Sequence, residues 1–97
     1  MMKPPLPADI VARVAADFPN ESHSALLAML DEYQGPERTR VIRCVVHLAA
    51  RNTDKLLDCI KSAMTDYRDV IYWAEYDAGE QKVRDFNQPF ATVAGGR

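Results

Sequence analysis

The chain has 97 residues, with 12 Lys and Arg against 14 Asp and Glu, which gives a formal net charge of -2. A length of this order fits one domain, and a hydrophobic fraction of 47% with 27% charged residues is typical of water-soluble globular proteins, which excludes wholly disordered, fibrous and membrane classes. The near-balanced charge creates no general attraction for nucleic acid, so binding of that kind would depend on a local basic patch.

The N-terminal sequence MMKPPLPADI has prolines where a signal peptide would carry its apolar segment. The longest apolar run, ALLAML at residues 25–30, is much shorter than a membrane span. We therefore expect a cytoplasmic protein of bacterial type, with Cys44 and Cys59 reduced and no membrane partner.

Helical periodicity dominates the first 77 residues. The apolar spacing predicts helices over residues 8–18 and about 21–34, the second capped by Asn20 or Ser22. Gly35 and Pro36 separate them from a third helix, over about 36–51, whose β-branched apolar face predicts a central position held by packing.

Two further helices are expected after residue 51. Asn52 or Thr53 is placed to cap the fourth helix, and Thr65 or Asp66 to cap the fifth. After Asp77 the apolar period fades. The sequence therefore predicts an all-α fold: a compact bundle of about five short helices over residues 1–77, followed by a loosely ordered tail over 78–97, flexible or docked, with Phe86 and Phe90 as its candidate contacts.

The third helix carries a line of basic side chains opposite its apolar face: Arg40, Arg43, His47 and Arg51. Such a stripe can follow a phosphate backbone, which makes nucleic-acid binding or a regulatory role the alternative interpretation of the protein. The simpler interpretation is a solvated polar face, which any amphipathic helix needs opposite its core.

The fifth helix has more aromatic surface than one core-facing side can hold. Val70, Ile71 and Ala74 share the expected core-facing arc with Tyr67, and three further aromatic residues lie outside that arc: Tyr72, Trp73 and Tyr76. Either the tail covers them, with Phe86 or Phe90 over Trp73, or they form a contact surface, since Trp and Tyr dominate the energetics of protein interfaces.

No catalytic, cofactor-binding or metal-binding motif is present. Cys44 and His47, three residues apart, supply half of a zinc-ligand pattern, and the other half is missing. The acidic pairs have capping or surface roles, and no pattern places two carboxylates in a shared apolar pocket. The sequence therefore predicts a protein that is not an enzyme and has no cofactor.

Residues 37–77 prompt a resemblance, most specific at Asp66–Val70 (DYRDV) with the Ala-Glu-Tyr that ends at Tyr76. This segment resembles a group of small uncharacterised bacterial proteins in which a helix ending in Leu-Ala precedes an Asp-Lys/Arg-Leu stretch and then Asp-Tyr/Trp-Arg-Asp-Val. It covers less than half of the chain. The resemblance implies a shared helical domain and transfers no function.

Taken together, the sequence predicts a small helical domain that acts by association with itself or with another protein, a homodimer being the simplest form. Its candidate contact residues are Tyr72, Trp73 and Tyr76.

Overall fold

A computed structural model describes residues 6–90 of the chain. The described part is all-α and contains four helices: α1 (Ala8–Asp17), α2 (His23–Asp31), α3 (Arg38–Ala49) and α4 (Thr53–Glu75). No β-strand occurs within these residues, although Tyr76 and Lys82 form an isolated antiparallel bridge. None of the described helices combines the length and the apolar character needed to cross a bilayer.

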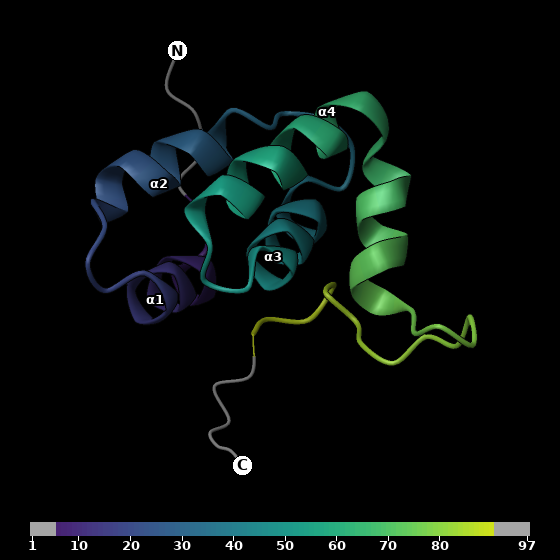
Figure 1. The fold of residues 1–97 in the computed structure, drawn as a ribbon. Coiled ribbons are helices and arrows are strands. Elements are labelled where there is room, and N and C mark those ends of the chain that lie inside the picture. Colours follow the sequence, from purple (N-terminus) through teal and green to yellow (C-terminus); the bar gives the residue numbers. More distant parts are fainter. Residues whose placement is uncertain (1–5, 91–97) are drawn as a thin grey trace.

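The predicted bundle of about five helices differs from the structure in one place. The fourth and fifth predicted helices are the two halves of α4, which is continuous except at Asp66, whose backbone (φ -154°, ψ 99°) is extended. Figure 1 shows the second half of α4 turned sharply away from the first. Asp66 acts here as a cap, because its Oδ1 accepts a hydrogen bond from the Arg68 N–H at 3.1 Å.

Side-chain caps also mark the starts of α2 and α4. The Ser22 hydroxyl accepts a bond from the Ala25 N–H at the start of α2, and the Asn52 side chain accepts one from the Lys55 N–H at the start of α4. α3 ends at Ala49, and the residue that follows it, Ala50, has a left-handed backbone (φ 50°) without being glycine.

The turn before α3 needs a glycine because it passes very close to an aromatic ring. A Cβ on Gly35 would lie 2.7 Å from the Tyr33 hydroxyl oxygen. The Tyr33 ring is buried, and its hydroxyl donates to the Pro36 carbonyl at 2.6 Å. The ring therefore fills the space that a side chain would need.

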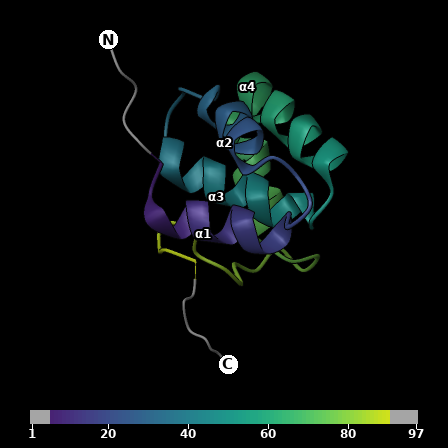
Figure 2. The ribbon, with the colours of Figure 1, turned by 90° about the vertical axis from the view of Figure 1, so that its left-hand side faces the viewer.

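The central position predicted for the third helix is confirmed. α3 packs most extensively against α4 and also contacts α1, while α2 contacts both α1 and α4. Seven of the 12 residues of α3 are buried. Figure 2, turned by 90°, shows α1 alongside α3. The fully buried side chains of the core come from all four helices: Ile10, Val14, Leu30, Val41, Ile42, Val45, Val46, Leu56 and Val70.

The segment after α4 packs on the helices through Phe86 and Phe90, the two residues of the predicted tail that the sequence offers as docking contacts. It runs back toward the side of the molecule where α1 and α3 lie (Figure 1). Phe86 and Phe90 are each only 8% exposed and belong to the hydrophobic core. The last part of the predicted tail, residues 91–97, lies outside the described residues.

Candidate functional site

Arg40, the first residue of the predicted basic stripe, forms an ion pair with a buried carboxylate. Its Nη2 and Nε atoms donate to the two oxygens of Glu75 at 2.6 and 3.0 Å, and the Glu75 side chain is fully buried. Glu75 also accepts a bond from the Phe86 N–H at 2.9 Å. Burial raises the pKa of Glu75, but the bonds from Arg40 and Phe86 outweigh it and hold that pKa below its usual value.

Arg43, one turn further along α3, makes a second pair of the same kind. Its guanidinium donates to both oxygens of Asp9 in α1, at 2.8 and 3.0 Å. Its third bond goes to the Phe86 carbonyl at 3.1 Å, and Asp9 accepts from the Phe90 N–H at 3.0 Å. The Arg43 bond, followed by the Phe90 N–H, lowers the pKa of Asp9 although burial opposes this. Both arginines therefore join α3 to distant parts of the chain.

The other two residues of the stripe have different surroundings. His47 is half-buried, with its ring centroid 5.1 Å from that of Phe86, whereas Arg51 is exposed. The interpretation of the stripe as a solvated polar face is thus wrong for Arg40 and Arg43, because Glu75 and Asp9 neutralise them. A phosphate backbone would have to compete with these carboxylates, and nucleic-acid binding stays an untested prediction.

The three aromatic candidates occupy the outer side of the last turns of α4. Trp73 is 52% exposed and Tyr72 is 45% exposed, while Tyr76 is half-buried. The rings of Tyr72 and Tyr76 stack on each other, with centroids 5.2 Å apart and an interplanar angle of 21°. Half of the Trp73 surface thus stays open, while Phe86 and Phe90 pack on each other (centroids 5.8 Å apart) and against His47 and Arg13.

The opposite side of this half of α4 faces the core as the sequence predicts. Val70 and Ala74 are fully buried and Ile71 is 8% exposed, while Tyr67 is half-buried. The same half-helix therefore has one side in the core and another that carries uncovered aromatic rings.

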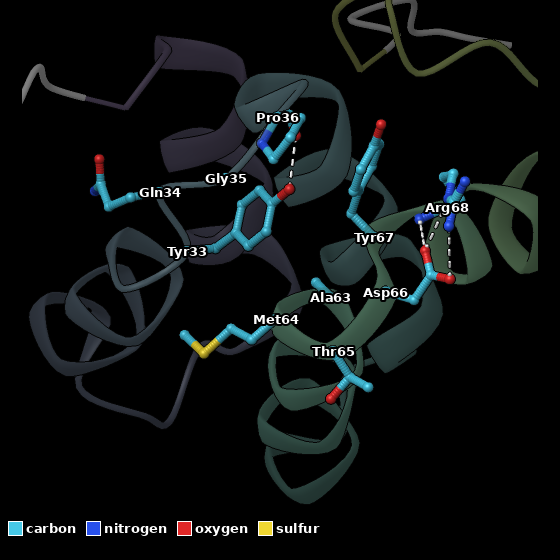
Figure 3. Close-up of a pocket in the computed structure, with 10 residues that line it drawn as sticks. All are labelled: Tyr33, Gln34, Gly35, Pro36, Ala63, Met64, Thr65, Asp66, Tyr67 and Arg68. Carbon is cyan, nitrogen blue, oxygen red and sulfur yellow. Dashed lines mark hydrogen bonds and ion pairs between the residues drawn. The ribbon is translucent and has the colours of Figure 1, made fainter.

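Two hollows lie along α4, one N-terminal to these rings and one that reaches Trp73. The larger has a volume of about 550 Å³ and lies at the kink, between α4 and the loop that follows α2; it is lined by Tyr33, Gln34, Gly35, Pro36, Ala63, Met64, Thr65, Asp66, Tyr67 and Arg68 (Figure 3). The smaller, of about 220 Å³, is lined by Lys61, Ser62, Thr65, Asp69 and Trp73. Thr65 borders both hollows, so the two are neighbours on one surface.

Charges of both signs border these hollows. Figure 3 shows the Asp66 carboxylate directed at the Arg68 guanidinium, to which it is bonded at 3.1 Å. The side-chain bond from Arg68 lowers the pKa of Asp66. Lys61 and Asp69 line the smaller hollow. We define the α4 surface as Met64, Thr65, Arg68, Asp69, Tyr72, Trp73 and Tyr76.

The described residues offer little for covalent or metal chemistry. Within residues 6–90 no group of three or more His, Cys, Asp or Glu side chains is arranged to hold a metal ion. Cys44 and Cys59 are not bonded to each other, and burial raises the pKa of the Cys44 thiol to about 12, so it is not a nucleophilic thiolate near neutral pH. In this part of the chain every buried side-chain polar atom has a hydrogen-bond partner.

The sequence analysis predicts neither the hollows nor the two ion pairs. The hollows depend on how the kink of α4 meets the loop after α2, and the ion pairs join residues 34 and 35 positions apart. The sequence signal for the ion pairs is the presence of two acidic residues, Asp9 and Glu75, on helices other than α3. Comparison of the chain with protein-family models, with curated proteins and with solved structures finds no match.

Proposed function

We propose that the protein is a non-enzymatic bacterial protein of the cytoplasm that acts by self-association, with the α4 surface as the contact between two copies. The observation that carries this proposal is the exposure of Trp73 and of the stacked Tyr72 ring on a helix whose opposite side lies in the core. Large aromatic rings on a surface are costly in water, and they are the side chains that contribute most to binding at protein interfaces.

Shape supports a second copy as the partner. In a two-fold dimer the same patch contacts itself, so it must carry both protruding and receiving parts. The α4 surface has both: the rings of Tyr72 and Trp73 are exposed, and the larger hollow lies N-terminal to Tyr72, next to the smaller one that Trp73 helps to line. Two copies of α4 that cross in antiparallel fashion would bring the rings of each to the hollows of the other.

The charges of the α4 surface are also compatible with self-pairing. It carries charges of both signs, in Arg68 and Asp69. A surface with charges of both signs can face a copy of itself without net repulsion.

Analytical ultracentrifugation tests this proposal. We expect the mass to rise with protein concentration, and Tyr72→Ser with Tyr76→Ser to weaken the dimer at least tenfold, since a single interface aromatic ring contributes about 1.4 kcal/mol or more. Fluorescence of Trp73, the single Trp of the chain, reports the same event directly. Its emission should shift to shorter wavelength, and its quenching by acrylamide should fall, as the concentration rises.

Val11→Ser is a matched control, because Val11 is also exposed (40%) but lies on α1. It should leave the dimer unchanged. The proposal fails if the wild-type chain stays monomeric at high concentration, or if the control weakens the dimer as much as the tyrosine variant does. Circular dichroism of each protein measures its helical content and so distinguishes both outcomes from unfolding.

A further inference from the structure

Residues 84–90, here called the strap, are held on α1, α3 and the end of α4 through their backbone. The Phe86 N–H donates to Glu75, the Phe86 carbonyl accepts from Arg43, and the Phe90 N–H donates to Asp9, at 2.9 to 3.1 Å. No regular helix or strand occurs within the strap. Its position therefore depends on side chains of the helices beneath it.

The two aromatic rings of the strap rest on charged or titratable side chains of those helices. The Phe86 ring lies 5.1 Å from the His47 ring, with the planes tilted by 43°. The Phe90 ring lies against Phe86, and the Arg13 guanidinium carbon is 4.6 Å from its centroid. His47 is thus half-buried, with its ring against that of Phe86.

The charges around His47 are mostly positive. Arg13 from α1 and Arg84 from the strap act on it, and Asp17 from α1 is the opposing carboxylate. Asp17 is already bonded to Arg13 at 2.9 Å. On α3 itself, the nearest charged neighbours toward the N-terminus are Arg43 and Arg40, which are paired with the buried carboxylates of Asp9 and Glu75.

We propose that protonation of His47 weakens the docking of the strap, so that the strap is closed near neutral pH and opens in mild acid. An imidazolium at this position would be half-buried beside two guanidinium groups, with one carboxylate nearby that already has a partner. Departure of the strap removes both the Phe86 ring that shields His47 from water and the positive charge of Arg84.

The direction of the effect follows from linkage. Burial, and then Arg84 and Arg13, lower the pKa of His47 from its ordinary value of 6.5 in the closed state. Opening returns the pKa toward that value, so the open state binds the proton more strongly. The closed state is therefore favoured fully above about pH 6.5 and loses population as the pH falls below that value. The ratio of closed to open molecules falls by up to about tenfold for each unit by which the pKa of His47 differs between the two states.

NMR titration of the His47 ring protons in the full-length chain tests the proposal, because linkage is reciprocal. We expect a pKa below 6.5 in the wild type and a higher value in Arg84→Gln, which keeps both strap rings, and in Phe86→Ala. Backbone resonances of Phe86 and Phe90 should shift between pH 7 and pH 5 in the wild type and remain unchanged in His47→Gln.

The His47→Gln variant retains His23, the other His of the chain. Comparison with the wild type therefore identifies which ring-proton signals belong to His47. The proposal is overturned if the His47 pKa is the same in the wild type and in Arg84→Gln, or if the strap resonances shift equally in the wild type and in His47→Gln. Neither readout depends on self-association, and titration at a concentration below that of dimer formation keeps this test separate from that of the α4 surface.

Discussion

Glu75 and Arg40 form a bidentate ion pair across 35 residues of sequence, and the Glu75 side chain has no exposed surface. Burial of two opposite charges costs a large desolvation free energy, which their attraction and hydrogen bonds repay only when the geometry is good. Here both carboxylate oxygens face the guanidinium, and the Phe86 N–H supplies a further bond. The pair fixes the second half of α4 against α3.

Replacement of Arg40 by Met should destabilise the protein strongly. The substitution retains apolar volume but leaves the Glu75 carboxylate buried beside Lys82, whose Nζ lies 3.5 Å away, without its main partner. We expect the free energy of unfolding to fall by about 3 to 5 kcal/mol, as measured by urea denaturation.

The double variant Arg40→Met with Glu75→Leu provides the control. Removal of both charges should recover most of the stability, since an apolar pair of similar volume avoids the desolvation cost. A single Arg40→Met variant within about 1 kcal/mol of the wild type would show that the ion pair has little role in stability.

Acid should destabilise the protein through Glu75 and Asp9. The pKa of each is lower in the folded chain than its ordinary value, which is 4.5 for Glu75 and 3.8 for Asp9. The unfolded chain therefore binds protons more readily, and the stabilisation is complete above about pH 4.5 and is lost as the pH falls toward the folded-state values. Urea denaturation from pH 6 to pH 3 measures this loss.

Asp9→Asn isolates one of the two contributions. At pH 6 this variant should be less stable than the wild type, because Arg43 loses its carboxylate. The difference should narrow as the pH falls, since the wild-type Asp9 then becomes protonated. A difference that stays constant down to pH 3 would contradict the lowered pKa of Asp9.

Gly35→Ala should destabilise the turn between α2 and α3. The new methyl group would lie 2.7 Å from the Tyr33 hydroxyl oxygen and 2.9 Å from two ring carbons, so the buried ring must move and its bond to Pro36 weakens. We expect a loss of about 1 to 3 kcal/mol in the free energy of unfolding, measured by urea denaturation.

Gly79→Ala is the matched control for this substitution. The nearest atom to its new methyl group, an Asp77 carboxylate oxygen, lies at 3.4 Å, which is an ordinary contact. The two glycine variants should therefore differ clearly. Equal stabilities would show that Tyr33 can move without cost.

The helices follow from local sequence patterns, and these were sufficient for most of the fold. Apolar spacing indicates five helical segments, of which the last two are the halves of α4. The caps at Ser22, Asn52 and Asp66 are short-range effects that involve residues two or three positions apart. Whether Asp66 separates two helices or bends one depends on the path of the chain around it. Capping chemistry alone does not distinguish these outcomes.

The roles of Arg40 and Arg43 could not be obtained in the same way. A helical wheel places both opposite the apolar side of α3, and it gives the same result whether water or a carboxylate lies beyond them. Their partners, Glu75 and Asp9, come from the last and the first helix. The same long-range contacts position the strap, whose sequence has no periodic pattern of its own.

The prediction that Tyr72, Trp73 and Tyr76 lie outside the core-facing side of the helix depends less on tertiary structure than the roles of Arg40 and Arg43 do. α4 is apolar on more than one side, so part of that apolar surface must either lie under another segment or stay open. The sequence could not decide between these outcomes, because the positions of Phe86 and Phe90 depend on Asp9, Arg43 and Glu75. Trp73 stays half exposed because those contacts place Phe86 against His47 and Phe90 against Arg13, and not over Trp73.

The ion pair between Arg40 and Glu75 also has a consequence for the order of folding during synthesis. A ribosome makes Arg40 well before Glu75, so α3 emerges with a guanidinium group that has no buried partner yet. Hydrophobic contacts among α1, α2 and α3 can form early, but the side of α3 that carries Arg40 has to remain hydrated until the end of α4 arrives. Completion of the core is therefore a late event, set by a contact between residues far apart in the chain.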